Sequence, residues 1–206
     1  MDTTEEKILV NRVKKGSIAA FEELIIEHEG KIYNIAYRFF NNEEDAKDLS
    51  QEIFIKVFNK IHRFRGDSSF STWLYRIAIN TCIDELRKRK GKESFSIDED
   101  IKTDEGTMAR EFQDKDLSPE EIVINKEIAS QIQWALNHLS ESYKEVVILR
   151  DFQGFEYKQI SEILGCSLGT VKSRISRART ELKNLLINEK HFDYKNRLKT
   201  RKEGKQ

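Results

Sequence analysis

The chain has 206 residues, and its 36 basic and 36 acidic side chains give a formal net charge of zero. One proline and nine glycines argue against collagen-like, proline-rich and turn-rich all-β folds, so the composition favours a helical protein of one or two domains. The sequence has no run of 18 apolar residues and starts with polar, acidic residues, so we expect no membrane insertion, no secretory signal and a cytoplasmic location.

Apolar residues at three- and four-residue steps predict helices over residues 18–40, 42–61 and 72–90, which would form an N-terminal domain over 8–90. The second of these helices starts at Asn42, with Asp45 three residues further on as in a helix-capping sequence. On a helical projection this helix carries Asp45, Asp48 and Glu52 on one side, with Gln51 at the edge. Such an acidic face suits a basic protein partner, and a solvated surface is the simpler alternative.

The segment around the start of the third helix combines aromatic, basic and amide side chains. Trp73, Arg76 and Asn80 share one face of the predicted helix, and Phe70 lies just before it. This combination suits unstacked nucleic-acid bases, which stack on rings and bond through their edges. Phe70 and Trp73 are equally consistent with core residues.

The net charge is distributed unevenly along the chain. Residues 1–90 carry a net charge of +1, residues 91–121 of −7 and residues 122–206 of +6. Low hydrophobicity and dense like charge predict a flexible acidic linker over 91–118, and the basic, polar tail over 189–206 is predicted to be disordered. The basic C-terminal part suggests a nucleic-acid partner, although solvated charges would give the same pattern.

After the linker, helices are predicted over 119–138, 141–152, 156–164 and 168–188, and residues 157–176 have the pattern of a helix-turn-helix. Gly165 stands where the shorter helix must end in left-handed backbone, and Ser167 can cap the next helix. Opposite an apolar stripe, the last helix carries small polar and basic residues, namely Lys172, Ser173, Ser176, Arg177 and Thr180, with Arg174 and Arg179 beside them. Such a face suits a helix in the DNA major groove, and an amphipathic helix with a basic solvent face is the alternative.

Three segments, residues 45–54, 70–80 and 168–179, together closely resemble bacterial RNA polymerase sigma factors, and more narrowly the extracytoplasmic-function group of the sigma-70 family. The resemblance covers residues 8–188. It implies an all-α fold of two small helical domains, with sigma region 2 over 8–90 and a sigma region 4 helix-turn-helix domain over 119–188. The two are joined by the linker 91–118, and the tail 189–206 is extra.

The resemblance also implies a function and a role for each surface. The chain would be an alternative sigma factor that binds core RNA polymerase and directs promoter-specific transcription initiation without catalysis of its own. The residues implied to bind the β′ coiled coil of the polymerase are Asp45, Asp48, Gln51 and Glu52, with Phe54 supporting the fold. Those implied to open and read the −10 promoter element are Asp67, Ser69, Phe70, Ser71, Thr72, Trp73, Arg76 and Asn80. Those implied to read the −35 element as duplex DNA are Thr170, Lys172, Ser173, Arg174, Ser176, Arg177 and Thr180.

Further implied features concern regulation and the linker. An anti-sigma factor, which can be membrane-bound, is the implied regulator, and the acidic linker would mimic nucleic acid near the polymerase active centre. Two residues depart from the family pattern. Ser140 stands where proline is frequent, and we expect it to cap a helix. Ser161 stands in place of alanine, and we expect its hydroxyl to bond back to the preceding helical turn.

Two other function classes remain open on the sequence. A conventional regulator would bind duplex DNA through residues 120–188 and never contact core polymerase. A nuclease would need a catalytic or metal-binding constellation, but the four histidines are scattered and Cys82 and Cys166 lie far apart without a CxxC motif. The sequence therefore predicts no catalytic residue, no metal site and no cofactor.

Overall fold

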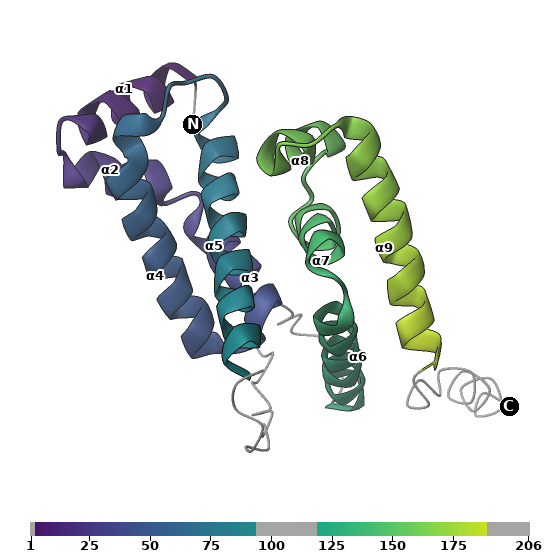
Figure 1. Ribbon diagram of the computed structural model, residues 1–206. Coiled ribbons are helices and arrows are strands. Elements are labelled where there is room, and N and C mark those ends of the chain that lie inside the picture. The colour runs from purple at the N-terminus through teal and green to yellow at the C-terminus, as the bar shows by residue number, and fades with distance from the viewer. Residues whose placement is uncertain (1–2, 94–118, 189–206) are drawn as a thin grey trace, which may run out of the picture.

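The computed structural model describes residues 3–93 and 119–188, and the elements in these two ranges are all helices (Figure 1). The first range contains α1 (Thr3–Lys14), α2 (Ile18–Ile25), α3 (Glu29–Phe40), α4 (Glu43–Lys60), the short η1 (Ile61–Arg63) and α5 (Phe70–Glu93). The second contains α6 (Pro119–His138), α7 (Glu141–Val147), the π-helical turn η2 (Ile148–Phe152), α8 (Tyr157–Leu164) and α9 (Leu168–Asn188). The all-α fold class is confirmed. Most of the predicted linker, and the predicted tail, lie outside the described residues.

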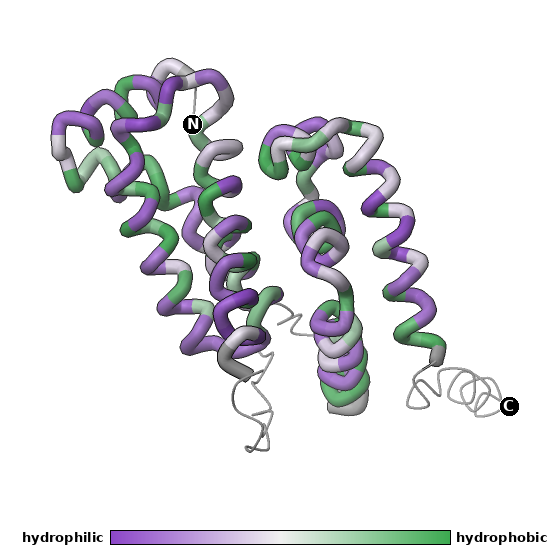
Figure 2. The backbone as a smooth tube through the Cα atoms, viewed as in Figure 1, coloured by the Kyte–Doolittle hydropathy of each residue, from purple (hydrophilic) through white to green (hydrophobic). Residues whose placement is uncertain are grey.

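Helices α3, α4 and α5 pack against one another in the N-terminal group, and α1 and α2 cover one end (Figure 1). Their shared core contains fully buried Leu24, Ile35, Ile53 and Leu74. Apolar and polar residues alternate in bands along the helices in Figure 2, as helices that share one core require. None of the helices in the described ranges is both long and apolar enough to cross a bilayer.

The prediction of one helix over 18–40 is wrong, because the chain breaks between α2 and α3. Ser17 caps α2 by accepting a hydrogen bond from the Ala20 amide. At the break, the His28 amide donates to the Ile25 carbonyl, and the His28 ring bonds the Tyr75 hydroxyl on α5 at 2.9 Å. A contact 47 residues away therefore fixes a turn that local periodicity does not show. The sequence pattern predicts no helix over the residues of α1, and the structure has one there.

In the C-terminal group, α8 and α9 form the predicted helix-turn-helix, and α7 packs against α9. Gly165 has φ of +64°, which confirms the left-handed end of α8, and the Ser167 hydroxyl accepts from the Thr170 amide at 3.1 Å. Ser140 and Ser161, the two residues that depart from the family pattern, do not make the side-chain hydrogen bonds expected of them. The Ser161 hydroxyl donates forward to the Cys166 carbonyl at 2.6 Å, and Ser140 precedes α7 without a side-chain cap.

The two groups of helices lie side by side and touch (Figure 1). Helix α5 contacts α8, and α3 contacts α6 and η2. Buried residues of both groups belong to one continuous apolar cluster. We call the first group, residues 3–93, the N-terminal domain and the second, residues 119–188, the C-terminal domain.

Candidate protein- and DNA-binding surfaces

The predicted acidic face lies on α4, whose first turn is capped by the Asn42 side chain accepting from the Asp45 amide at 2.9 Å. Asp48 and Gln51 are exposed, and Glu52 is half-buried and paired with Lys56 at 2.6 Å. Phe54 is half-buried and packs against the core, so it supports the helix. The structure therefore brings the predicted acidic residues onto one helix with Asp48 and Gln51 most accessible.

Asp45 is engaged within the chain. The Arg89 guanidinium on α5 donates to both Asp45 carboxylate oxygens, at 2.7 and 2.9 Å, and to Glu85 at 3.2 Å. The hydrogen bonds from Arg89 hold the pKa of Asp45 below its usual value. Asp45 thus joins α4 to α5 and is negatively charged at neutral pH. A partner of the acidic face must compete with Arg89 for it.

The predicted −10 residues around the start of α5 divide into buried and exposed groups. Phe70 and Thr72 are buried, so the core interpretation of Phe70 holds and neither side chain lies on the surface of this structure. Trp73 is half-buried, with its ring centroid 5.3 Å from that of Phe64. Asp67 and Ser69 are exposed, and Ser71 is half-buried.

The helix start itself is capped from two sides. The Ser69 hydroxyl accepts from the Thr72 amide at 3.2 Å, and the Glu6 carboxylate on α1 accepts from the Phe70 amide at 3.1 Å. One turn further along α5, Arg76 and Asn80 are exposed. The Arg76 guanidinium is not free, because it donates to the carbonyl oxygens of Glu162 and Ile163 at the end of α8.

The predicted −35 surface lies on α9. Five of its residues are exposed, namely Lys172, Ser173, Ser176, Arg177 and Thr180. The hydroxyl of Ser173 donates to the Thr170 carbonyl, and that of Thr180 to the Ser176 carbonyl, both at 3.0 Å. Small side chains folded back on the helix in this way leave the backbone accessible, which a helix entering the major groove needs.

The two arginines beside this face are tied to the body of the C-terminal domain. Arg174 donates to Glu145 on α7 at 3.0 Å, and Arg179 donates to both oxygens of Asp151 in η2. Burial raises the pKa of Glu145 to about 7, an effect that the Arg174 charge opposes. Arg174, predicted as a −35 contact, is therefore held between α7 and α9. Together with Arg179 it fixes how α9 is rotated about its axis.

Sequence reasoning missed two polar residues buried where the domains meet. Lys144 is 2% exposed, and its ammonium donates to the Phe39 carbonyl and the Asn137 side-chain oxygen, each at 2.8 Å. Gln133 is 1% exposed and donates to the Arg38 carbonyl at 3.0 Å. Neither contact has a sequence signal, since the acceptor in the other domain is main chain.

Comparisons with known proteins agree with the two-domain arrangement. Residues 24–92 match the family model for Sigma-70 region 2, and residues 126–182 match that for Sigma-70, region 4. The chain is 38% identical over 185 residues to the RNA polymerase sigma-H factor of Pseudomonas aeruginosa, covering 88% of this chain and 94% of the relative. It is 36% identical over 178 residues to the ECF RNA polymerase sigma factor SigW of Bacillus subtilis, covering 86% and 94%. Among solved structures, the sigma factor RpoE in complex with the anti-sigma factor NepR from Bartonella quintana matches with a TM-score of 0.62 and 26% identity, covering 84% of this chain and all of that one.

Proposed function

The chain belongs to the extracytoplasmic-function group of the sigma-70 family of RNA polymerase sigma factors, and from that membership we propose which surface performs each step of promoter-specific initiation. The function is that of an alternative sigma factor, which joins core RNA polymerase and directs it to promoters. Residues 8–90 are proposed to act as the core-binding and −10 module, and residues 119–188 as the −35 module. No catalytic step, metal or cofactor is assigned to the chain itself.

Core polymerase is proposed to bind the acidic face of α4, through the β′ coiled coil. Asp48 and Gln51 support this role because they are the most exposed of the predicted contacts, and the exposed Ile55 (61%) offers apolar area beside them. Asp45 and Glu52 contribute charge while remaining paired to Arg89 and Lys56. Exposed carboxylates around an apolar residue suit a basic partner helix, because they orient it at little cost in desolvation.

The −10 element is proposed to contact the start of α5. Asp67 and Ser69 lie at the exposed turn before the helix, and the exposed residues Arg76 and Asn80 follow along it, with the Arg76 guanidinium bonded to the end of α8 in this structure. Phe70 and Thr72 are proposed to support this surface from the core, since both are buried. Trp73, half-buried beside Phe64, provides a ring on which a displaced base can stack.

The −35 element is proposed to lie along α9, and the single observation that carries this proposal is the exposed face of that helix. Lys172 and Arg177 supply positive charge that suits phosphate groups or guanine. The small side chains of Ser173, Ser176 and Thr180 let the helix backbone approach the bases closely. Arg174 is proposed as a positioning residue through its bond to Glu145. Regulation by an anti-sigma factor is proposed as well, because the matched RpoE structure contains one.

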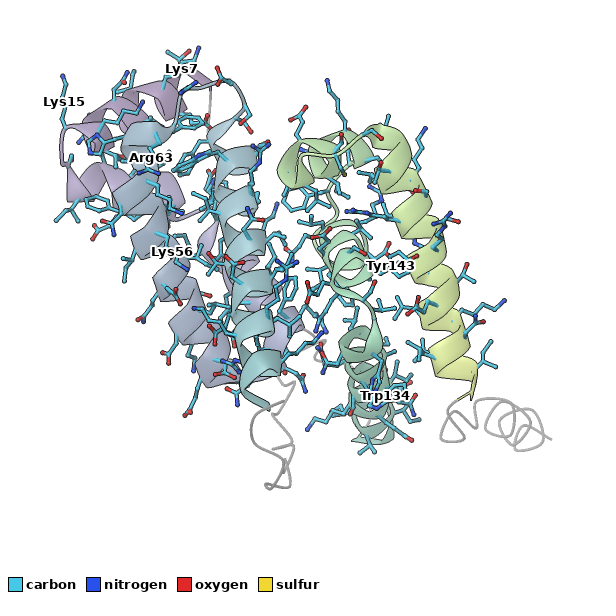
Figure 3. All side chains as sticks on the ribbon, in the orientation of Figure 1. Lys7, Lys15, Lys56, Arg63, Trp134 and Tyr143 are labelled. Carbon is cyan, nitrogen blue, oxygen red and sulfur yellow. The ribbon has the colours of Figure 1, made fainter. Side chains whose placement is uncertain are left out.

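The deciding experiment is transcription reconstituted with bacterial core polymerase on a promoter library, with and without this protein. Transcript starts that appear only with the protein, downstream of a shared −35/−10 pair, are the expected result. Asp48→Ala should reduce these starts by weakening core binding, and Lys15→Ala, an exposed change at the far end of the N-terminal domain (Figure 3), serves as the matched control. Duplex binding without any new start would instead indicate a conventional regulator.

A further inference from the structure

The loop between η1 and α5, residues 65–69, carries Asp67 and Ser69, which are proposed to contact the −10 element. We call it the −10 loop. Its residues are exposed apart from half-buried Ser68, and Gly66 has left-handed backbone with φ of +81°. An exposed loop of this kind has many accessible conformations, so its shape depends on how its two ends are held.

Buried aromatic rings hold the side chains at both ends of the −10 loop. Phe64 precedes the loop and Phe70 follows it, and their buried rings meet edge to face with centroids 6.0 Å apart. The Trp73 ring lies 5.3 Å from that of Phe64 and 6.1 Å from that of Phe70. These ring contacts leave the Phe64 carbonyl and the Phe70 amide in need of hydrogen-bond partners.

Helix α1 supplies a partner to each end of the −10 loop. The Glu6 carboxylate accepts from the Phe70 amide at 3.1 Å. The Lys14 ammonium donates to the Phe64 carbonyl at 2.7 Å and lies 6.0 Å from the centroid of the Phe64 ring. Glu6 and Lys14 are eight residues apart, which is slightly more than two helical turns, so they lie on adjoining sides of α1. One helix therefore bonds both ends of the loop.

Helix α1 is itself anchored in the N-terminal domain. Leu9, Val10 and Val13 are buried, and α1 packs against α2 and η1 at the end of the domain where α5 begins (Figure 1). The helix lies outside residues 24–92, which match the family model for region 2, and none of its residues is among the predicted −10 contacts. Its buried side chains give the two polar side chains that bond the loop a fixed point of attachment.

We infer that α1 positions the −10 loop, with Glu6 and Lys14 as positioning residues that set how strongly the protein discriminates among bases of the −10 element. The inference rests on the proposed function. A loop whose ends are fixed in the free protein loses less conformational freedom on binding, and it presents Asp67 and Ser69 in one arrangement. Release of either end lets the loop fit other bases nearly as well as the preferred one, so discrimination falls.

Base preference in reconstituted transcription tests the role of Glu6. Core polymerase with each full-length variant transcribes one promoter pool with a randomised −10 element and a second pool with a randomised −35 element. In Glu6→Ala we expect the ratio of transcription from preferred to disfavoured −10 bases to fall roughly two- to tenfold, as the loss of one hydrogen bond predicts, with −35 preference unchanged. Glu6→Gln keeps an oxygen for the Phe70 amide and should keep the preference. Lys7→Ala, an exposed change on the same helix (Figure 3), is the matched control.

The same two pools test Lys14. Lys14→Met removes the donor and keeps the length of the side chain, so it should reduce −10 discrimination, and Lys14→Arg should restore it. Lys15→Met changes the neighbouring exposed lysine (Figure 3) and should have no effect. An equal loss on all −10 sequences, with a weaker dependence on salt, would make Lys14 a phosphate contact and overturn its positioning role.

The outcomes separate this inference from the proposed function. An unchanged −10 preference in Glu6→Ala overturns the inference while the proposed function stands. So does a loss shared equally by all −10 and −35 sequences, because a merely structural role lowers the amount of active protein without changing its preference. Absence of promoter-dependent starts with the unaltered chain overturns the proposed function.

Hydrogen exchange in the free protein tests the bond between α1 and the loop without transcription. The amide of Phe70 should exchange faster in Glu6→Ala than in the unaltered chain, because it loses its acceptor. In Glu6→Gln and Lys7→Ala its exchange should match that of the unaltered chain. Equal exchange in Glu6→Ala and the unaltered chain, with helix content preserved by circular dichroism, would show that α1 does not hold the loop and would overturn the inference.

Discussion

Replacing Glu145 with glutamine should change how the stability of the protein depends on pH. Glu145 is buried on α7, with its side chain 11% exposed, and accepts a hydrogen bond from Arg174 at 3.0 Å. Glutamine keeps the size of the side chain and an oxygen for Arg174, but it cannot ionise. The comparison therefore isolates the free energy of placing a carboxylate at this position.

The expected magnitude follows from the two pKa values. Burial raises the pKa of Glu145 to about 7, against an ordinary value of 4.5. Between these values the folded protein binds more protons than the unfolded chain, so stability falls as pH rises through this window. A pKa difference of about 2.5 corresponds to about 3 kcal/mol, which the natural protein should lose relative to Glu145→Gln by pH 8.

Urea unfolding followed by circular dichroism between pH 5 and pH 8 measures this difference. The two proteins should be similarly stable at pH 5 and should diverge as pH rises, with Glu145→Gln the more stable at pH 8. Glu22→Gln, which changes an exposed carboxylate on α2, should follow the natural protein throughout. The reasoning is refuted if the natural protein is the more stable one at pH 8, because Arg174 would then outweigh the cost of burying the charge.

Three further substitutions have expected effects. Arg177→Ala should weaken discrimination of the −35 sequence by about 1–3 kcal/mol in duplex binding, whereas an equal loss on all DNA would make Arg177 a phosphate contact. Gly165→Ala should lower the free energy of unfolding by about 1–2 kcal/mol, because φ is +64° there, and Gly169→Ala within α9 should cost nothing comparable. Ile53→Ala should cost about 2–5 kcal/mol in urea unfolding, and a similar loss at exposed Ile55 would contradict the assigned orientation of α4.

The elements whose signals are local were predictable from the sequence. The structure has three such features where the sequence predicts them, namely the cap at Asn42, the glycine turn at Gly165 and the cap at Ser167. Each depends on residues within a few positions along the chain. The break between α2 and α3 was not predictable, because the His28 ring is held by Tyr75 on another helix. Local periodicity contains no information about such a partner.

The candidate surfaces were predictable only in part, for the same reason. Spacing places Lys172, Ser176 and Arg177 on the exposed face of α9, where the structure has them. The residue types at Arg174 and Arg76 suit DNA equally well, yet the first is bonded to Glu145 and the second to carbonyls of α8. Whether an arginine reaches solvent or another helix depends on tertiary packing, which a single helix projection does not include.

The interdomain hydrogen bonds of Lys144, Gln133 and Arg76 also determine what variation among related sequences can reveal about these contacts. Positions that change together in related sequences are used to infer spatial contact. In these bonds the acceptor is a backbone carbonyl, which is present whatever side chain occupies its position. Drift at Phe39, Glu162 or Ile163 would therefore leave the bonds intact and produce no compensating change at the donors. Methods based on covariation would therefore overlook these three sets of hydrogen bonds, and domains exchanged between related proteins could still form them, provided that the three donors are retained.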